Sequence, residues 1–265
     1  MNIQGPNEER QKDITHDFSD HSELILNVQD LVGKTEHSFK EFAPGDLTEC
    51  GRFLSTEEGE KKKKRNILLA EDTAVELGSP GCISASSILW TKKKGIVKDG
   101  IWISSPDLNK SIRRASYSYA QLIMVELEKD ADPTDTKFQN LKNLTNRIPG
   151  YMTRNVPGKI WVRISKDLKR NGFNLLELAR CLIRSYRESF QNIISISVVL
   201  LAGEPETVSE LESISELARL ITFNNKKRRL KADGKITCGE SRCTSCQDSK
   251  ICDEINRILS KKNKE

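Results

Sequence analysis

The alternation of apolar and polar residues is clearest in the second half of the chain. Lys159-Ile-Trp-Val-Arg-Ile164 is rich in β-branched and aromatic residues and predicts a strand. Ile193–Ala202 is a nearly unbroken run of Ile, Val and Leu, which is typical of a strand buried on both faces. Between them, Asn174 with Glu177 three residues later marks a helix start, and an apolar stripe continues from there to about Ser189.

A second helix is predicted over Glu206–Thr222. Strand, helix, buried strand and helix form a βαβα unit, whose two strands we expect to pair in parallel. At three-residue spacing the second helix carries Leu211, Ile214, Leu217 and Leu220. This spacing suits a helix-docking or nuclear-export-like stripe, and packing in the core explains it equally well.

The first half of the chain gives shorter signals. Three β-rich runs separated by turn residues predict strands at Ile83–Trp90, Gly100–Ser104 and Tyr117–Leu127. Residues 129–158 form a long irregular connection, which in a compact domain is either functional or mobile. Together these elements predict an α/β fold, with mixed α+β as the alternative, in a central domain at residues 84–225 that ends in the βαβα unit.

The N-terminal residues 1–60 are polar and aperiodic. We therefore expect an acidic, disordered tail with at most one transient helix at Ser22–Val32. Such a tail is a plausible docking peptide for a protein partner, as is the helix at 206–222. The three histidines of the chain lie in this tail, and we expect them to be solvated without a metal or catalytic role: His16, His21 and His37.

Charge divides the chain into two unequal parts. Residues 1–60 hold 14 Asp and Glu against 5 Lys and Arg, a net charge of −9. Because the whole chain carries +5, the remaining residues carry +14. An acidic tail ahead of a basic body suggests an electrostatic partner, which is either a nucleic acid or the tail itself.

Two basic runs strengthen the nucleic-acid hypothesis. The first lies in a predicted basic linker at residues 61–83 and reads as a targeting signal: Lys61, Lys62, Lys63, Lys64 and Arg65. The second is a candidate phosphate contact: Lys226, Lys227, Arg228 and Arg229. Arg113 and Arg114 are further candidates, and aromatic residues near cations could stack on bases, although a place in the core explains these tryptophans as well: Trp90, Trp102 and Trp161.

The composition limits the part of the cell in which the protein is expected. The 265 residues include 31% charged and 36% hydrophobic residues, with no apolar run of 18 or more and no secretory signal at the N-terminus. We therefore expect no membrane partner and a cytoplasmic or nuclear location, or both. Seven cysteines, an odd number, favour thiols and metal sites over disulfides.

Four of those cysteines lie close together in residues 226–265, which we predict to be a small basic metal-binding module. They are spaced C-x4-C-x2-C-x5-C: Cys238, Cys243, Cys246 and Cys252. Four thiolates at this spacing can converge on one tetrahedral metal ion. We expect structural zinc, with an iron–sulfur cluster as the alternative. A coincidental cluster and a redox pair at Cys243 and Cys246 stay open as well.

The iron–sulfur alternative rests on a resemblance. Cys238-x4-Cys243-x2-Cys246, with Gly239 and Glu240 after the first cysteine, resembles the loop that holds the [2Fe–2S] cluster in plant-type ferredoxins. The resemblance covers nine residues. That family takes its fourth cysteine from far downstream, whereas here Cys252 follows after six positions and Ser241 and Arg242 replace small residues. The resemblance implies a cluster ligand set and does not extend to electron transfer.

The chain has none of the common catalytic motifs. It lacks a P-loop, G-x-G-x-x-G, G-x-S-x-G and H-E-x-x-H, and no histidine follows His37. Glu204 and Glu206 follow a buried strand, where ligand sites occur in α/β folds, but carboxylates at a helix start explain them more simply. We therefore predict a protein without enzymatic activity.

The function that these features predict is that of an intracellular regulatory protein associated with RNA or another nucleic acid. Its layout would suit a multifunctional protein of an RNA virus or a nuclear factor. The alternative from another class is a protein-interaction adaptor whose basic runs are nuclear targeting signals. A third hypothesis is an iron–sulfur redox protein.

Overall fold

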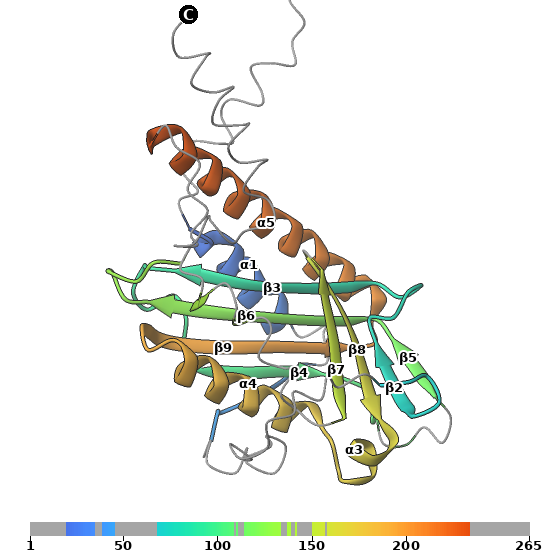
Figure 1. The fold of residues 1–265 in the computed structure, drawn as a ribbon. Helices are drawn as coiled ribbons and strands as arrows, with labels where there is room; N and C mark the ends of the chain where they lie inside the picture. Colours follow the sequence, from blue (N-terminus) through green and yellow to red (C-terminus); the bar gives the residue numbers. More distant parts are fainter. Residues whose placement is uncertain are drawn as a thin grey trace, which may run out of the picture.

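The computed structural model describes residues 20–34, 39–45, 68–108, 110, 114–133, 137–138, 141, 150–156 and 158–233, with side chains up to residue 225. Within these residues the chain forms a mixed α/β fold of two mixed sheets and four helices. Figure 1 shows the larger sheet lying between α1 and α5 on one face and α4 on the other. The strands of the smaller sheet run across those of the larger one.

The larger sheet has five strands in the order β1-β4-β9-β6-β3. The β4/β9 and β6/β3 pairs are parallel, and the β1/β4 and β9/β6 pairs are antiparallel. The predicted strands at 83–90, 100–104 and 193–202 are confirmed, and the strand predicted at 117–127 is confirmed from Tyr119 on, because Tyr117 belongs to a strand of the smaller sheet. The bounds are β1 (Lys40–Phe42), β3 (Ser84–Thr91), β4 (Gly100–Ser104), β6 (Tyr119–Leu127) and β9 (Ile193–Ala202).

The smaller sheet has four strands in the order β5-β2-β8-β7. The β5/β2 pair is parallel, and the β2/β8 and β8/β7 pairs are antiparallel. The bounds are β2 (Thr73–Leu77), β5 (Ala115–Tyr117), β7 (Tyr151–Val156) and β8 (Lys159–Ser165). Strand β2 lies within the segment predicted to be a linker, and β7 lies within the connection predicted to be irregular.

Two apolar cores lie on the two faces of the larger sheet. Strand β6 serves both, because its side chains alternate: Leu122 and Met124 face α1 and α5, while Ile123 and Val125 face α4 and the smaller sheet. Strand β9 is buried from Ile196 to Ala202, which confirms that it is covered on both faces. The core on the α4 side also contains residues of the smaller sheet, which therefore packs against one face of the larger sheet.

The helices begin where the sequence indicates. Helix α4 (Leu175–Ser189) starts at the N-cap Asn174, whose side chain accepts a hydrogen bond from the Glu177 amide at 2.9 Å. A short α3 (Lys166–Arg170) is capped by Ser165. The predicted helix at 206–222 is confirmed and extends further, as α5 (Pro205–Asp233).

The predicted pairing within the βαβα unit is wrong. Strand β8 belongs to the smaller sheet, whereas β9 pairs with β4 and β6 in the larger one. The physical reason is that β8 buries only one face: Ile160, Val162 and Ile164 are buried and the residues between them are not. A one-sided strand cannot be an interior neighbour of β9, which is buried on both faces.

Part of the segment predicted to be a disordered tail is a packed helix. Helix α1 (Ser22–Gly33) buries Leu24, Ile25, Val28, Leu31 and Val32 against the larger sheet and α5. His21, which was expected to be solvated, is 1% exposed. Its Nδ1 accepts a hydrogen bond from the Trp90 amide at 3.2 Å, and its ring lies edge-on to the Trp90 indole. The disordered tail is therefore not confirmed over these residues.

No helix in the described part of the chain is long and apolar enough to cross a membrane.

Candidate functional site

The outer face of the smaller sheet gathers arginines around one tryptophan. Strand β8 points Trp161 and Arg163 away from the core, because they alternate with its buried residues. The strand register places Arg154 of β7 opposite Trp161 and Glu76 of β2 opposite Arg163. Arg114, directly before β5, reaches the same place from the far edge of the sheet. We call these five residues the Trp161 face.

The carboxylate of Glu76 organises this face. Its Oε1 lies 2.6 Å from Arg114 Nη2 and 2.8 Å from Arg163 Nε, and the Glu76 side chain is only 6% exposed. Burial alone would raise the pKa of Glu76, but hydrogen bonds and the positive charges of the two guanidiniums lower it below its usual value. Arg163 also donates to the Leu68 carbonyl at 3.0 Å. Arg163 is therefore held in place by two acceptors.

Two guanidiniums lie over the ring of Trp161. The guanidinium carbons of Arg163 and Arg154 lie 4.5 and 5.6 Å from the ring centroid, within cation–π range. The indole Nε1 is buried and has no hydrogen-bond partner in the described structure. A buried donor of this kind is uncommon in folded proteins and costs about 1–3 kcal/mol.

Chemically, the Trp161 face suits an anion that carries an aromatic group. Three guanidiniums face one carboxylate, so positive charge remains after the internal pairs are made. Arg154 is exposed and Arg114 is half-exposed, whereas Arg163 is mostly covered. The two more accessible arginines can reach phosphate oxygens, and an aromatic ligand can pack near the indole.

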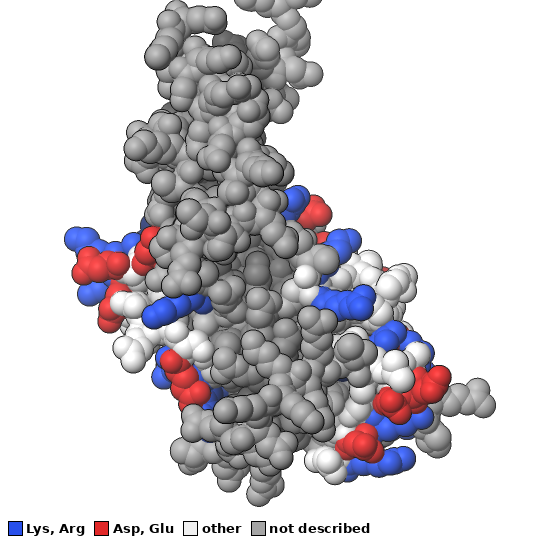
Figure 2. Space-filling view, viewed as in Figure 1, with Lys and Arg blue, Asp and Glu red and all other residues white. Residues whose placement is uncertain are grey.

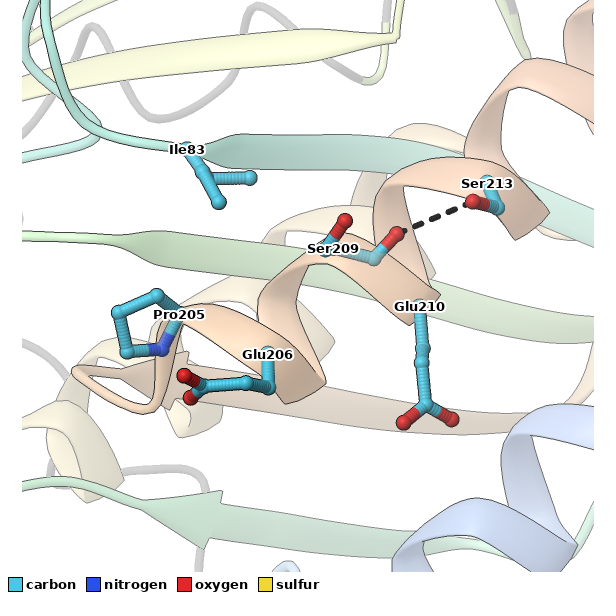
Figure 3. Close-up of a pocket in the computed structure, with 6 residues that line it drawn as sticks. All are labelled: Ile83, Pro205, Glu206, Ser209, Glu210 and Ser213. Atoms are coloured by element: carbon cyan, nitrogen blue, oxygen red, sulfur yellow. Dashed lines mark hydrogen bonds between the residues drawn. The ribbon is translucent and has the colours of Figure 1, made fainter.

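A different surface lies at the start of α5. There an open groove of about 460 Å³ is lined by Ile83, Pro205, Glu206, Ser209, Glu210 and Ser213 (Figure 3). Its two carboxylates would repel an anion, so it does not share the chemistry of the Trp161 face. Glu204 precedes it with a left-handed φ of 43° and accepts from Ser104 Oγ at 2.6 Å. Glu204 and Glu206 therefore lie at the start of α5, as expected for carboxylates at a helix N-terminus.

The structure locates few of the residues predicted from the sequence as sites. Arg114 is one of them; it is ion-paired with Glu76 and its side chain is 43% exposed. The second basic run lies in the last turns of α5, where side chains are not described. The remaining candidates lie outside the described residues: Lys61, Lys62, Lys63, Lys64, Arg65, Arg113, Cys238, Cys243, Cys246 and Cys252.

No three His, Cys, Asp or Glu side chains within the described ranges lie close enough together to hold a metal ion. Trp161 was considered from the sequence, whereas Glu76, Arg154 and Arg163 were not. The alternation in Lys159-Ile-Trp-Val-Arg-Ile164 is the signal that places Trp161 and Arg163 on one face. Arg154 joins them only through the β7/β8 register, which no local sequence pattern indicates.

Comparison with known proteins defines the class. The sequence profile of CdhC, the CO dehydrogenase/acetyl-CoA synthase complex beta subunit, matches residues 56–208, more than half of the chain. The chain therefore belongs to this family. The match spans β2 to β9 and includes the whole smaller sheet.

Individual relatives carry names that match this family. The chain is 28% identical over 200 residues to the acetyl-CoA decarbonylase/synthase complex subunit beta of Methanothermobacter thermautotrophicus, covering 74% of this chain and 41% of the relative. It is 28% identical over 167 residues to the same-named subunit of Methanopyrus kandleri, covering 62% and 34%. For the subunit of Archaeoglobus fulgidus the identity is 26% over 195 residues, covering 72% and 35%. The chain thus spans about two fifths or less of each of these relatives.

These findings overturn the predicted function. The prediction of a nucleic-acid-associated or adaptor protein, viral or nuclear, is wrong, because the relatives are archaeal subunits of an enzyme complex. The prediction of a protein outside enzymatic chemistry is wrong for the same reason. The prediction of RNA as the partner is wrong as well, because the relatives are named as subunits of a protein complex. In the view of Figure 2, Lys and Arg alternate with Asp and Glu over the described surface instead of forming one basic patch.

The prediction of zinc has no support from the family match or from the described residues. The iron–sulfur alternative fits a family of CO dehydrogenase/acetyl-CoA synthase subunits.

Proposed function

We propose that this chain works in a complex that makes or cleaves acetyl-CoA, with other protein subunits as its partners. The observation that carries the proposal is the family match over residues 56–208. The relatives named above are beta subunits of acetyl-CoA decarbonylase/synthase complexes, and the matched span holds the Trp161 face.

Within this function, the Trp161 face binds the nucleotide end of coenzyme A. That end carries an adenine ring and three phosphate groups, so it presents both an aromatic plane and several negative charges. Arg154 and Arg114 are placed to contact phosphate oxygens, and the adenine packs beside Trp161. Arg163 acts as a positioning residue, because its hydrogen bonds to Glu76 and Leu68 hold it against the indole.

The four cysteines at 238–252 supply a donor set that fits an iron–sulfur cluster. Four soft thiolates within fifteen residues are sufficient to ligate one cluster. When bound, such a cluster would supply redox capacity near the domain. The cysteines lie beyond the span that the family profile matches, so their role rests on donor chemistry alone.

Calorimetric titration of the full chain with coenzyme A tests the proposal. Arg154→Gln keeps the fold, because Arg154 is exposed, and removes one charged contact. We expect its Kd to rise about tenfold, since a hydrogen bond to a charged group contributes about 1.5–3 kcal/mol. The matched control is Arg187→Gln, which breaks an exposed ion pair with Asp99 at the end of α4. A wild-type chain that does not bind coenzyme A, or an equal loss in both variants, contradicts the proposal.

A further inference from the structure

Helix α5 carries two separate stripes. One is buried against the larger sheet and α1, and consists of Val208, Leu211, Ser215 and Ala218. The other lies on an exposed side of the helix and also repeats every three or four residues. We call it the outer stripe: Glu206, Glu210, Ser213, Leu217 and Leu220.

The outer stripe has an acidic end and an apolar end. Figure 3 shows the side chains of Glu206 and Glu210 pointing to the same side of α5, whereas Ile83 lies on the other side of the helix in this view. Two turns further on, Leu217 and Leu220 are 50% and 48% exposed, and Phe223 beside them is 61% exposed. Large apolar side chains gathered on one exposed helix face mark an interaction surface.

We infer that the occupant of the outer stripe is this chain's own residues 251–264, docked antiparallel to α5. Those residues lie outside the described part of the chain. They place Ile251, Ile255 and Ile258 at the same four-then-three spacing. Three lysines follow at once, in the order Lys261, Lys262 and Lys264. The three isoleucines, among which Asp253, Glu254 and Arg257 also lie, therefore precede the lysines. This order is the reverse of that in the outer stripe, where the acids precede the leucines.

The antiparallel direction follows from matching the two patterns. With Ile255 against Leu217, the same spacing puts Ile258 at Ser213, whose small, exposed side chain leaves room. Lys262 then lies at Glu210. A parallel arrangement would place the lysines against the leucines and the isoleucines against the glutamates.

The length of the connection permits this return. Seventeen residues separate Asp233, the end of α5, from Ile251. Going back from Asp233 to the level of Leu220 spans about 20 Å along the helix, whereas the connection can extend to roughly 55 Å. Docking would anchor the four cysteines beside the domain, because three of them lie within this connection and Cys252 lies in the docked residues.

Hydrogen exchange of the full chain, followed by mass spectrometry, tests the inference. In the wild type we expect the amides of 251–264 to exchange at least tenfold more slowly than those of an unstructured peptide. Leu217→Asp should raise their rate about tenfold, because it places a charge in the apolar contact. Leu69→Asp is the control, since Leu69 is 57% exposed on another part of the surface and should leave the rate unchanged.

A charge exchange makes the test specific. Glu210→Lys should speed exchange of 251–264, and adding Lys262→Glu to it should restore the wild-type rate. Carbodiimide cross-linking should join Lys262 to Glu210 within one chain, with the ion pair of Lys159 and Glu212, 2.9 Å apart, as the positive control. Unprotected amides in 251–264 overturn the inference. So do cross-links found only between isotopically distinct chains, which would assign the stripe to a second copy. The result does not depend on whether coenzyme A binds.

Discussion

Glu76 and Arg163 face each other across the β2/β8 pair, and their 2.8 Å contact joins the fold to the candidate site. The same carboxylate also holds Arg114. One buried acid therefore sets the positions of two guanidiniums on the Trp161 face.

Glu76→Gln should destabilise the protein. The amide keeps the shape of the carboxylate but leaves two guanidiniums without their counter-charge. We expect the free energy of unfolding to fall by about 2 kcal/mol, less than for a fully buried pair because Arg114 is partly in solvent. Urea denaturation at pH 7 measures this. The control Glu188→Gln, in an exposed pair with Arg184, should change it by less than about 0.5 kcal/mol. Equal effects would show that Glu76 has no organising role.

The burial of His21 predicts a pH dependence of stability. Burial lowers the pKa of His21 from 6.5 to about 4, although a hydrogen bond to the Ala218 backbone and the charge of Asp20 act in the opposite direction. Between these two pH values the unfolded chain binds a proton that the folded chain does not. Stability should therefore fall as pH decreases from about 6.5 to 4, by up to about 3 kcal/mol.

Denaturation curves at intervals from pH 7 to 4 measure this slope in the wild type and in His21→Phe. The stability of the variant should depend less on pH between these values, because the variant lacks the titrating group. Asp20 also has a lowered pKa, since its hydrogen bonds from Ser22 and Thr91 outweigh the effect of burial. Its contribution is lost only at lower pH, so it does not mimic that of His21. The same slope in both proteins would contradict the burial of His21.

Gly78 is expected to tolerate no side chain. It ends β2 with a φ of +62°, and an added Cβ would overlap the carbonyl oxygen of Ile160 and lie 2.7 Å from Ser84 Cβ. Gly78→Ala should cost about 3 kcal/mol or more. Gly172→Ala shares the positive φ, at +82°, but meets open space, so it should cost about 1–2 kcal/mol. Thermal unfolding of both variants separates the effect of crowding from that of backbone strain. If the two variants lose similar amounts of stability, crowding at Gly78 is excluded.

Metal analysis of anaerobically purified protein tests the four-cysteine segment. We expect iron and acid-labile sulfide with visible absorbance, both lost when Cys243 and Cys246 are changed to Ser. The buried Cys181→Ser serves as a control outside the segment. Zinc without iron, or iron retained in the double variant, would contradict the iron–sulfur assignment.

The sequence predicted the elements better than their assembly. The run in β9 and the capped stripe of α4 are local patterns, and both were confirmed. Pairing was missed because the one-sided β8 and the two-sided β9 are adjacent in sequence but belong to different sheets. Helix α1 was predicted at Ser22–Val32 only as a transient helix, because its apolar residues lie in a strongly acidic segment, where composition suggests disorder.

The site was less predictable than the fold. Alternation alone places Trp161 and Arg163 on one face of the strand, so that part of the site could be predicted from the sequence. Glu76 comes from a strand more than eighty residues earlier, and only the β2/β8 register brings it to Arg163. The basic runs suggested nucleic-acid binding. Net charge alone does not show which Lys and Arg side chains are already paired with acids.

Binding of the nucleotide end of coenzyme A at the Trp161 face can be tested by comparing two ligands in two proteins. Calorimetry would measure the Kd of coenzyme A and of pantetheine, which lacks the nucleotide and its phosphates, for the wild type and for Arg154→Gln. We expect the wild type to prefer coenzyme A and the variant to lose about tenfold of this preference while binding pantetheine unchanged. If both proteins show the same preference, the nucleotide does not bind at the Trp161 face.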